Sequence, residues 1–159
     1  MIRDVREKDL DQVLELNESC VPAVNSVPLE QMQWFAEHAA YFRVAAADDV
    51  VGGFLVGLRP GTSYASPNYR WFCDNYPDFA YVDRVAVAEV ARRQGLASRF
   101  YDDFRDSISD SVDVMTCEVN IRPANESSMR FHEQYGFRQV ASQETDGGDK
   151  EVALMVRPL

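Results

Sequence analysis

Apolar and polar residues alternate along this chain with two periods, one typical of strands and one of helices. Short apolar or alternating runs predict strands at residues 2–5, 41–47, 50–58, 80–87, 111–120, 136–144 and 150–159. Apolar residues three and four positions apart predict helices at residues 6–19, 29–39, 95–108 and 125–135. The element order is β-α-α-β-β-β-α-β-α-β-β. Hairpins together with one parallel step predict an α/β (α+β) fold, with a mixed, largely antiparallel sheet of six to seven strands and helices on both faces.

Turn-forming residues support these boundaries. Asp9 is a candidate N-cap for the first helix. Asp48 and Asp49 separate two strands and predict a tight hairpin. Gly52 and Gly53 lie inside a strand, where glycine indicates a bulge or a close approach of another segment.

Residues 59–79 differ from the rest of the chain. The sequence "RPGTSYASPNYRWFCDNYPDF" combines proline, glycine and many aromatic residues without a clear period. A loop of this length in a compact domain is usually functional or disordered, and its aromatic content argues against disorder. We therefore interpret it as an ordered lid or wall over a site, with plain packing as the alternative.

Composition and charge limit the function. The 159 residues fit a single domain spanning 1–159. The net charge of −10 disfavours binding to nucleic acid or anionic membranes and suits a cationic substrate such as an amine. No apolar run reaches membrane-spanning length, and the charged start lacks a signal-peptide pattern, so we expect a cytoplasmic protein. The three cysteines are far apart, which is typical of reduced thiols, and we expect no metal.

A basic turn separates the strand at 80–87 from the next helix. Its spacing is Arg92-x-x-Gly95-x-Ala97. The first N–H groups of a helix have no intrahelical partner and attract anions, and glycine allows close approach to the backbone. Two arginines add positive charge at the same place. The turn therefore suits a pyrophosphate, although the phosphate-binding patterns GxxxxGK[ST] and GxGxxG are both absent.

Two motifs together resemble a known family. The spacing at Arg92 is similar to the Arg/Gln-x-x-Gly-x-Gly/Ala pyrophosphate motif of the GNAT superfamily of acyl-CoA-dependent N-acetyltransferases. The segment "NESSMRFHEQYGF" at 125–137 resembles the family's Asn-x-x-Ala-x-x-Phe-Tyr-x-x-x-Gly-Phe segment, after the expected strand. The resemblance covers essentially the whole chain. It implies a GNAT-like fold that transfers an acetyl group from acetyl-CoA by direct attack of a primary amine of a small molecule or peptide.

The resemblance also implies a set of coenzyme A contacts. The backbone of one strand end would pair with the pantetheine arm, the turn would wrap the pyrophosphate, and the helix at 125–135 would contact the pantetheine. The implied residues are Val85, Ala86, Val87, Arg92, Arg93, Gln94, Gly95, Leu96, Ala97, Ser98, Asn125, Ser128 and His132. Residues 125, 128, 129 and 132 share one helix side. The alternative for Asn125 is that it caps this helix.

One position departs from the family pattern. His132 stands where the family often has a tyrosine that protonates the departing thiolate. A histidine with an ordinary pKa of about 6.5 can donate a proton near neutral pH. Alternatively, His132 hydrogen-bonds coenzyme A or the backbone. Tyr135 is the reserve acid, or a core residue.

The attacking amine must first lose a proton. Strand alternation puts Asp83 on the same side as Val85 and Val87, and Glu118 ends the adjacent strand, so either carboxylate is a candidate base. Each is alternatively a structural ion-pair partner, for example of Arg84 or Arg122. The developing oxyanion would be met by a backbone N–H, for which we name Val87.

Competing functions and partners follow from the same residues. A non-catalytic acyl-CoA-binding sensor is the alternative to an enzyme, because the tyrosine is replaced. A site for another phosphate ligand is a third reading, which the second motif disfavours. The predicted partners are an amine acceptor and, as one option, a second copy of the chain in a homodimer. Segment 59–79 would select the acceptor through Tyr64, Asn68, Tyr69 and Trp71.

Overall fold

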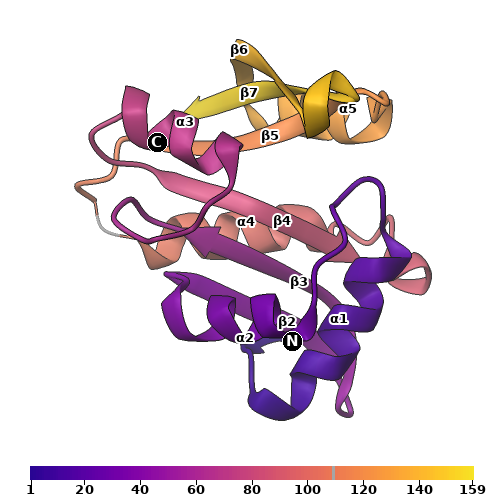
Figure 1. Cartoon of the computed structure of the whole chain (residues 1–159). Helices are drawn as coiled ribbons and strands as arrows, with labels where there is room; N and C mark the ends of the chain where they lie inside the picture. The colour runs from indigo at the N-terminus through magenta and orange to yellow at the C-terminus, as the bar shows by residue number, and fades with distance from the viewer. Residues whose placement is uncertain (109) are drawn as a thin grey trace. The chain divides into compact units, whose positions relative to one another are not determined.

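The computed structural model describes residues 1–108 and 110–159 (Figure 1). The strands of these residues are β1 (Ile2–Asp4), β2 (Tyr41–Ala47), β3 (Val50–Leu58), β4 (Ala80–Val87), β5 (Val114–Arg122), β6 (Arg138–Thr145) and β7 (Lys150–Pro158). The α-helices are α1 (Leu10–Ser19), α2 (Leu29–His38), α3 (Pro67–Asn75), α4 (Leu96–Ser107) and α5 (Glu126–Tyr135). Neighbouring strands follow the order β1-β2-β3-β4-β5-β7-β6. The predicted fold class, a mixed and mostly antiparallel sheet with helices, is confirmed.

The chain divides into two compact units, and β4 contributes to both. The first unit contains Met1–Leu58 and Arg84–Ser107, and the second contains Arg59–Asp83 and Ile108–Leu159. The single-domain organisation stays a prediction.

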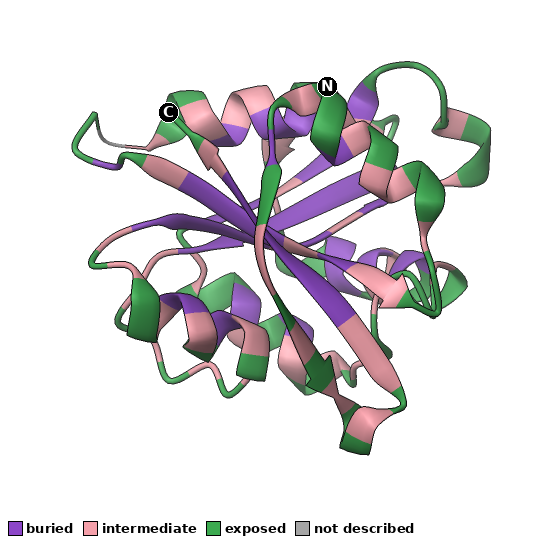
Figure 2. Ribbon diagram, turned by 90° about the horizontal axis from the view of Figure 1, so that it is seen from above, coloured by how far each residue is buried: buried purple, intermediate pink, exposed green. Residues whose placement is uncertain are grey.

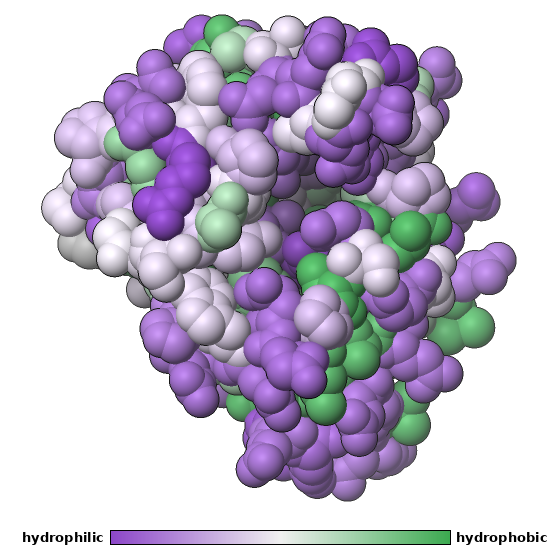
Figure 3. Space-filling model, viewed as in Figure 1, coloured by the Kyte–Doolittle hydropathy of each residue, from purple (hydrophilic) through white to green (hydrophobic). Residues whose placement is uncertain are grey.

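None of the helices in the described residues is long and apolar enough to span a membrane. Most of the face shown in Figure 3 is hydrophilic, as the net charge of −10 leads one to expect.

The first unit is built on the antiparallel strands β1, β2 and β3. Asp48 and Asp49 both adopt left-handed φ values, 50° and 64°, as a two-residue hairpin turn requires. The pairing register shifts opposite Gly52, and a Cβ on Gly53 would lie 3.0 Å from Leu96 Cδ2. The predicted hairpin, bulge and close approach are therefore all confirmed.

Buried helix faces complete the core of this unit. Figure 2 shows buried residues concentrated along the strands and on one face of the helices. The buried helical positions recur at the three- and four-residue spacing of an amphipathic helix. They include Leu10, Val13 and Leu16 on α1, Met32 and Phe35 on α2, and Leu96, Phe100, Tyr101 and Phe104 on α4.

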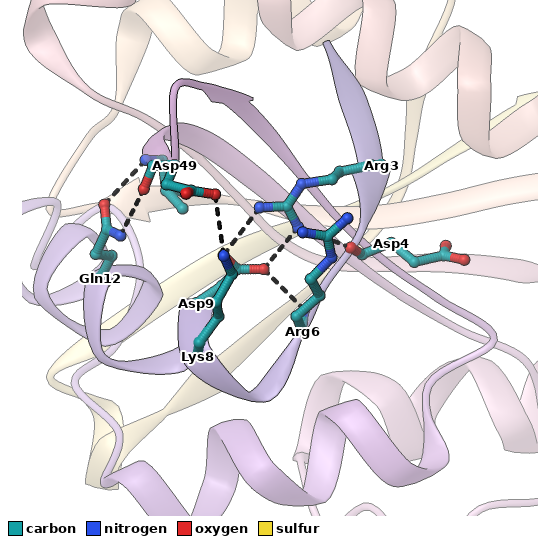
Figure 4. A network of polar contacts seen from close by, with 8 residues as sticks. Arg3, Asp4, Arg6, Lys8, Asp9, Gln12 and Asp49 are labelled. Atoms are coloured by element: carbon teal, nitrogen blue, oxygen red, sulfur yellow. Dashed lines mark hydrogen bonds and ion pairs between the residues drawn. The ribbon is translucent and has the colours of Figure 1, made fainter.

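Asp9 anchors β1 to the start of α1, as Figure 4 shows. Asp9 occupies the N-cap position of α1 as predicted, but its carboxylate makes no capping bond to that helix. It instead accepts hydrogen bonds from Arg3 Nη1 at 2.7 Å, Arg3 Nη2 at 3.0 Å and the Arg6 N–H at 2.8 Å. The Arg3 guanidinium holds the pKa of the buried Asp9 carboxyl below its usual value, against the opposing effect of burial.

The second unit joins the start of β4 to β5, β7 and β6. β4 pairs in parallel with β5 through Ala80 with Met115 and Tyr81 with Thr116. β7 lies antiparallel to both β5 and β6. The predicted turn between β6 and β7 is present as a short 3-10 turn at Asp146–Gly148.

Segment 59–79 contains a helix that the sequence analysis did not predict. α3 starts after Ser66, whose side chain accepts a hydrogen bond from the Tyr69 N–H, and Pro67 occupies its first turn. Both features are ordinary signals of a helix start. The prediction that this segment is ordered rather than flexible agrees with the structure, but its description as a loop without period is wrong.

Candidate functional site

The turn before α4 has the backbone geometry of an anion site. Arg93 and Gly95 adopt left-handed φ values of 64° and 72°. Left-handed residues in such a turn direct backbone N–H groups to one side, where they bind anions. A Cβ built on Gly95 would meet no atom within 4 Å among the described residues, so the backbone is open to a ligand there. This arrangement fits a pyrophosphate.

The side chains of the turn surround this backbone. Arg92, Arg93 and Gln94 are exposed, and Arg92 Nε donates to the Val87 carbonyl at 3.1 Å. Leu96 is buried in the core, so only its backbone N–H is available to a ligand. Ala97 and Ser98 are half-buried on the first turn of α4. Within the first unit, the turn therefore combines positive side chains with the start of a twelve-residue helix.

The end of β4 leads into this turn. Ala86 is buried, whereas Val85 and Val87 are half-buried on the opposite face. The next residue, Ala88, donates its N–H to the Gly52 carbonyl at 2.8 Å. The pairing of Val85–Val87 with a pantetheine arm and the oxyanion contact at the Val87 N–H stay predictions.

A tyrosine and two carboxylates form a polar cluster in the second unit. The Tyr81 hydroxyl lies 2.9 Å from Glu118 Oε1 and 2.7 Å from Oε2, so it donates to the carboxylate. Tyr81 is fully buried, but Glu118 and Asp83 are half-buried and so have atoms at the surface. Burial raises the pKa of Tyr81 well above its usual value, and the charges of Glu118 and Asp83 add to this effect. Tyr81 therefore remains a proton donor at neutral pH.

Sequence reasoning named both carboxylates but missed Tyr81. The signal was available in part, since Tyr81 and Asp83 are two residues apart on β4 and share a face. The cross-strand contact to Glu118 depends on a register that the sequence does not reveal. The alternative ion-pair partners have other contacts: Arg84 donates to the side-chain oxygens of Asn17 and Asn25 in the first unit, and Arg122 Nη1 lies 3.6 Å from Glu151.

The start of α5 uses the side chain of Asn125. Its Oδ1 accepts a hydrogen bond from the Ser128 N–H at 3.2 Å, so the alternative role of helix cap is confirmed. Capping occupies the side-chain oxygen and leaves the amide nitrogen as the group that would donate to pantetheine. Ser128 is half-buried on the same helix.

His132 is buried on α5 and held through one ring nitrogen. Its Nδ1 lies 2.7 Å from the Ser128 carbonyl oxygen. A carbonyl only accepts, so Nδ1 carries the proton and Nε2 is the acceptor of the neutral ring. Burial lowers the pKa of His132 below its usual value, against the effect of the Ser128 hydrogen bond. A role as proton donor requires the charged ring, which burial disfavours. The role of His132 stays a prediction.

Tyr135 packs at the end of α5. Its ring stacks near Phe131 and Phe137 with centroids 6.1 Å away in each case, and the Arg157 guanidinium lies 5.0 Å from its centroid. Arg157 Nε also donates to the Tyr135 carbonyl at 2.9 Å. These are packing contacts, but Tyr135 is half-buried and so is not the buried core residue of the alternative; the reserve acid role stays a prediction.

The aromatic residues of segment 59–79 have unequal exposure. Tyr64, Asn68 and Trp71 are half-buried, and Asn68 Oδ1 accepts a hydrogen bond from Gln143 Nε2 at 3.0 Å. Tyr69 is fully buried. The prediction that Tyr69 contacts an acceptor does not fit this burial, because its ring packs into the core. Tyr64, Asn68 and Trp71 remain predicted acceptor contacts.

Comparison with known proteins agrees with this geometry. The sequence model described as "Acetyltransferase (GNAT) family" matches residues 10–137. An N-alpha-acetyltransferase of Saccharolobus solfataricus is 25% identical, covering 99% of this chain and 92% of the relative. The crystal structure of Ard1 from Thermoplasma volcanium matches with a TM-score of 0.78 at 21% identity, covering 100% of this chain and 97% of that one. Arabidopsis thaliana NAA60, solved with a bisubstrate analogue, also has a TM-score of 0.78, at 15% identity over 99% and 97% of the two chains.

Proposed function

This chain belongs to the acetyltransferase (GNAT) family, and we propose that its acceptor is the α-amino group at the N-terminus of a peptide or protein. As a member of this family it is an N-acetyltransferase, and the family's acyl donor is acetyl-CoA. Two relatives named N-alpha-acetyltransferase, from Saccharolobus solfataricus and Sulfurisphaera tokodaii, each match 99% of the chain. Their names support an α-amine over a lysine side chain or a small diamine.

The observation that carries acetyl-CoA binding is the turn before α4. Left-handed Arg93 and Gly95 present the backbone, and exposed Arg92 adds positive charge. A pyrophosphate gains charge-assisted hydrogen bonds from such N–H groups and from the start of a helix. Acetyl-CoA supplies an activated acetyl group in the form of a thioester.

The acidic cluster provides the base. An N-terminal amine with a pKa near 8 is largely protonated at pH 7 and must lose its proton before it attacks. Half-buried Glu118 accepts that proton on a carboxylate oxygen, with Asp83 as the second candidate. The amine nitrogen then bonds to the acetyl carbonyl carbon, the carbon–sulfur bond breaks, and the second proton of the nitrogen leaves to solvent water. The thiolate takes a proton from His132, Tyr135 or water, and the Val87 N–H would stabilise charge on the carbonyl oxygen.

Three acceptors test the proposal. The first is a peptide with a free N-terminus and one lysine, the second is the same peptide with a formylated N-terminus, and the third is a small diamine. Fragment mass spectrometry after reaction with acetyl-CoA is expected to locate the acetyl group on the α-amine of the first peptide. The formylated peptide is expected to remain unmodified. Acetylated lysine or diamine with no modified α-amine would refute the proposed acceptor.

Two variants test the proposed base. Glu118→Gln keeps the side-chain size but cannot accept the proton, so turnover is expected to fall by roughly 10²-fold. Glu144→Gln, on the edge strand β6, is the matched control and is expected to keep the full rate. Unchanged turnover in Glu118→Gln would assign the proton to Asp83 or water.

A further inference from the structure

Segment 59–79 is closed at its base by an ion pair. Arg59 Nη2 lies 2.9 Å from Asp78 Oδ1 and 2.8 Å from Oδ2, and Arg59 Nε lies 3.3 Å from Oδ1. Arg59 follows the last residue of β3, and Asp78 stands two residues before β4. The ion pair therefore links the two ends of the segment, and α3 lies between these ends in the sequence.

The Tyr69 hydroxyl ties α3 to the start of this segment. It donates to the Arg59 carbonyl at 2.8 Å and accepts from the Thr62 N–H at 3.2 Å and Thr62 Oγ1 at 2.9 Å. A phenol has one proton to donate and accepts through its oxygen, so these bonds use its full capacity. A buried hydroxyl with this many partners indicates a site whose geometry is strongly specified.

Tyr81 belongs to a group of four fully buried rings. Tyr69, Phe72, Phe79 and Tyr81 have essentially no exposed surface. The Tyr81 ring centroid lies 5.6 Å from that of Tyr69 and 5.8 Å from that of Phe72. Phe79 closes the group, 5.9 Å from Tyr69 and 6.1 Å from Phe72. Packing on these sides removes the rotamer freedom that the Tyr81 side chain would otherwise have.

We propose that Tyr69 and Phe72 of α3 are positioning residues that hold the Tyr81 hydroxyl against Glu118. Tyr81 then fixes the orientation of the Glu118 carboxylate through its contacts at 2.7 and 2.9 Å. This inference rests on the proposed role of Glu118 as the base. Because Tyr81 is fully buried, it acts on the reaction through Glu118 and not by touching the acceptor.

Other titratable groups face the same cluster. Asp83 on β4 and Tyr64 in segment 59–79 both act electrostatically on Tyr81. Cys73 on α3 lies beside Tyr69, and Cys117 on β5 is next to Glu118 in the chain. A carboxylate that loses hydrogen bonds is protonated more easily, so loosening Tyr81 shifts the acid limb of activity to higher pH.

The test compares two variants on α3 with two matched controls. Tyr69→Phe removes only the hydroxyl, and Phe72→Leu reduces the ring contact. Tyr41→Phe removes another buried hydroxyl, which donates to Asp103 at 2.7 Å, and Phe104→Leu reduces a fully buried ring on α4. For the α3 variants we expect kcat to fall roughly 3- to 10-fold, which is less than the loss expected when a general base is removed. We also expect the acid limb of their kcat–pH profile to move to higher pH. The KM for acetyl-CoA is expected to stay unchanged, and both controls are expected to keep the unmodified pH profile.

A double-mutant cycle separates positioning from general structural damage. If Tyr69 acts through Tyr81, then Tyr69→Phe should have no further effect on kcat in a Tyr81→Phe background. Additive effects of the two changes, or an unchanged pH profile in Tyr69→Phe, would overturn the inference. If that happens while Glu118→Gln shows its expected loss of turnover, only the inference fails and the proposed base stands. If the unmodified enzyme acetylates no amine, both fail.

Discussion

Replacement of Gly95 by alanine tests the assignment of the turn before α4. The residue has a φ of +72°, and a Cβ there would point into space that is open among the described residues. The added methyl group therefore lies where the pyrophosphate is expected. Gly61→Ala is the matched control, because Gly61 has a φ of +99° and equally open surroundings but lies in segment 59–79.

The two substitutions should lower the stability of the fold by similar amounts but differ greatly in their effect on the affinity for acetyl-CoA. A side chain in the left-handed region costs roughly 1–1.5 kcal/mol. For a domain of this size, such a loss lowers Tm by roughly 2–5 °C. At Gly95, displacing one charge-assisted hydrogen bond to pyrophosphate costs a further 1.5–3 kcal/mol or so. That loss corresponds to a Kd for acetyl-CoA raised about 10- to 150-fold.

Isothermal titration and thermal denaturation measure the two effects on the same samples. We expect both variants to melt a few degrees lower, and only Gly95→Ala to bind acetyl-CoA weakly. Gly95→Asp adds a like charge and should abolish binding while the fold survives. If Gly95→Ala binds as tightly as the unmodified protein, or Gly61→Ala binds as weakly, the turn is not the pyrophosphate site.

Three further predictions concern other parts of the chain. Asp9→Asn should lower Tm by roughly 5–10 °C at pH 7, whereas the exposed Asp4→Asn should change it little. The difference should shrink as the pH falls below 3.8, where the unfolded carboxyl takes a proton, and vanish only below the lowered pKa of the folded Asp9; a constant difference would contradict this. The free energy of unfolding should fall less between pH 7.5 and pH 5.5 in His132→Gln than in the unmodified protein, because the unfolded ring takes a proton near pH 6.5 and burial lowers the pKa of the folded ring. The same fall in both proteins would contradict this. The double variant Tyr64→Ala, Trp71→Ala should raise the KM for the acceptor far more than the KM for acetyl-CoA. An equal rise in both would show that segment 59–79 supports the fold and does not select the acceptor.

Local patterns were sufficient to predict most of the fold. Alternation predicted the strands, and two adjacent aspartates predicted the turn at Asp48 and Asp49 because few other residues adopt left-handed geometry. The bulge at Gly52 and the tight contact at Gly53 followed from the cost of glycine inside a strand. Each of these signals lies within a few residues of the feature that it predicts.

Features that depend on distant residues were missed. Asp9 has the type and place of a helix cap, but Arg3 on β1 competes for its carboxylate. Tyr81 meets Glu118 across two strands, and only the observed register brings them together. The left-handed φ of Arg93 likewise has no signal in residue type, since arginine rarely adopts it.

α3 was missed for a different reason. Ser66 and Pro67 are ordinary signals of a helix start, and Tyr69, Phe72 and Tyr76 follow at helical spacing. Prolines near both ends of the segment, with Gly61 next to the first of them, outweighed this short period. Counting apolar spacing inside the segment would have found the helix and predicted that Tyr69 is buried.

The central claim is that this chain transfers an acetyl group from acetyl-CoA to an N-terminal amine. The most direct measurement follows free thiol and acetylated peptide in one reaction, with a peptide whose N-terminus is free. We expect one thiol for each acetylated α-amine, at a rate proportional to enzyme concentration. Tight binding of acetyl-CoA without either product would contradict the claim and identify the protein as a sensor, and thiol release without acetylated amine would show that water is the acceptor.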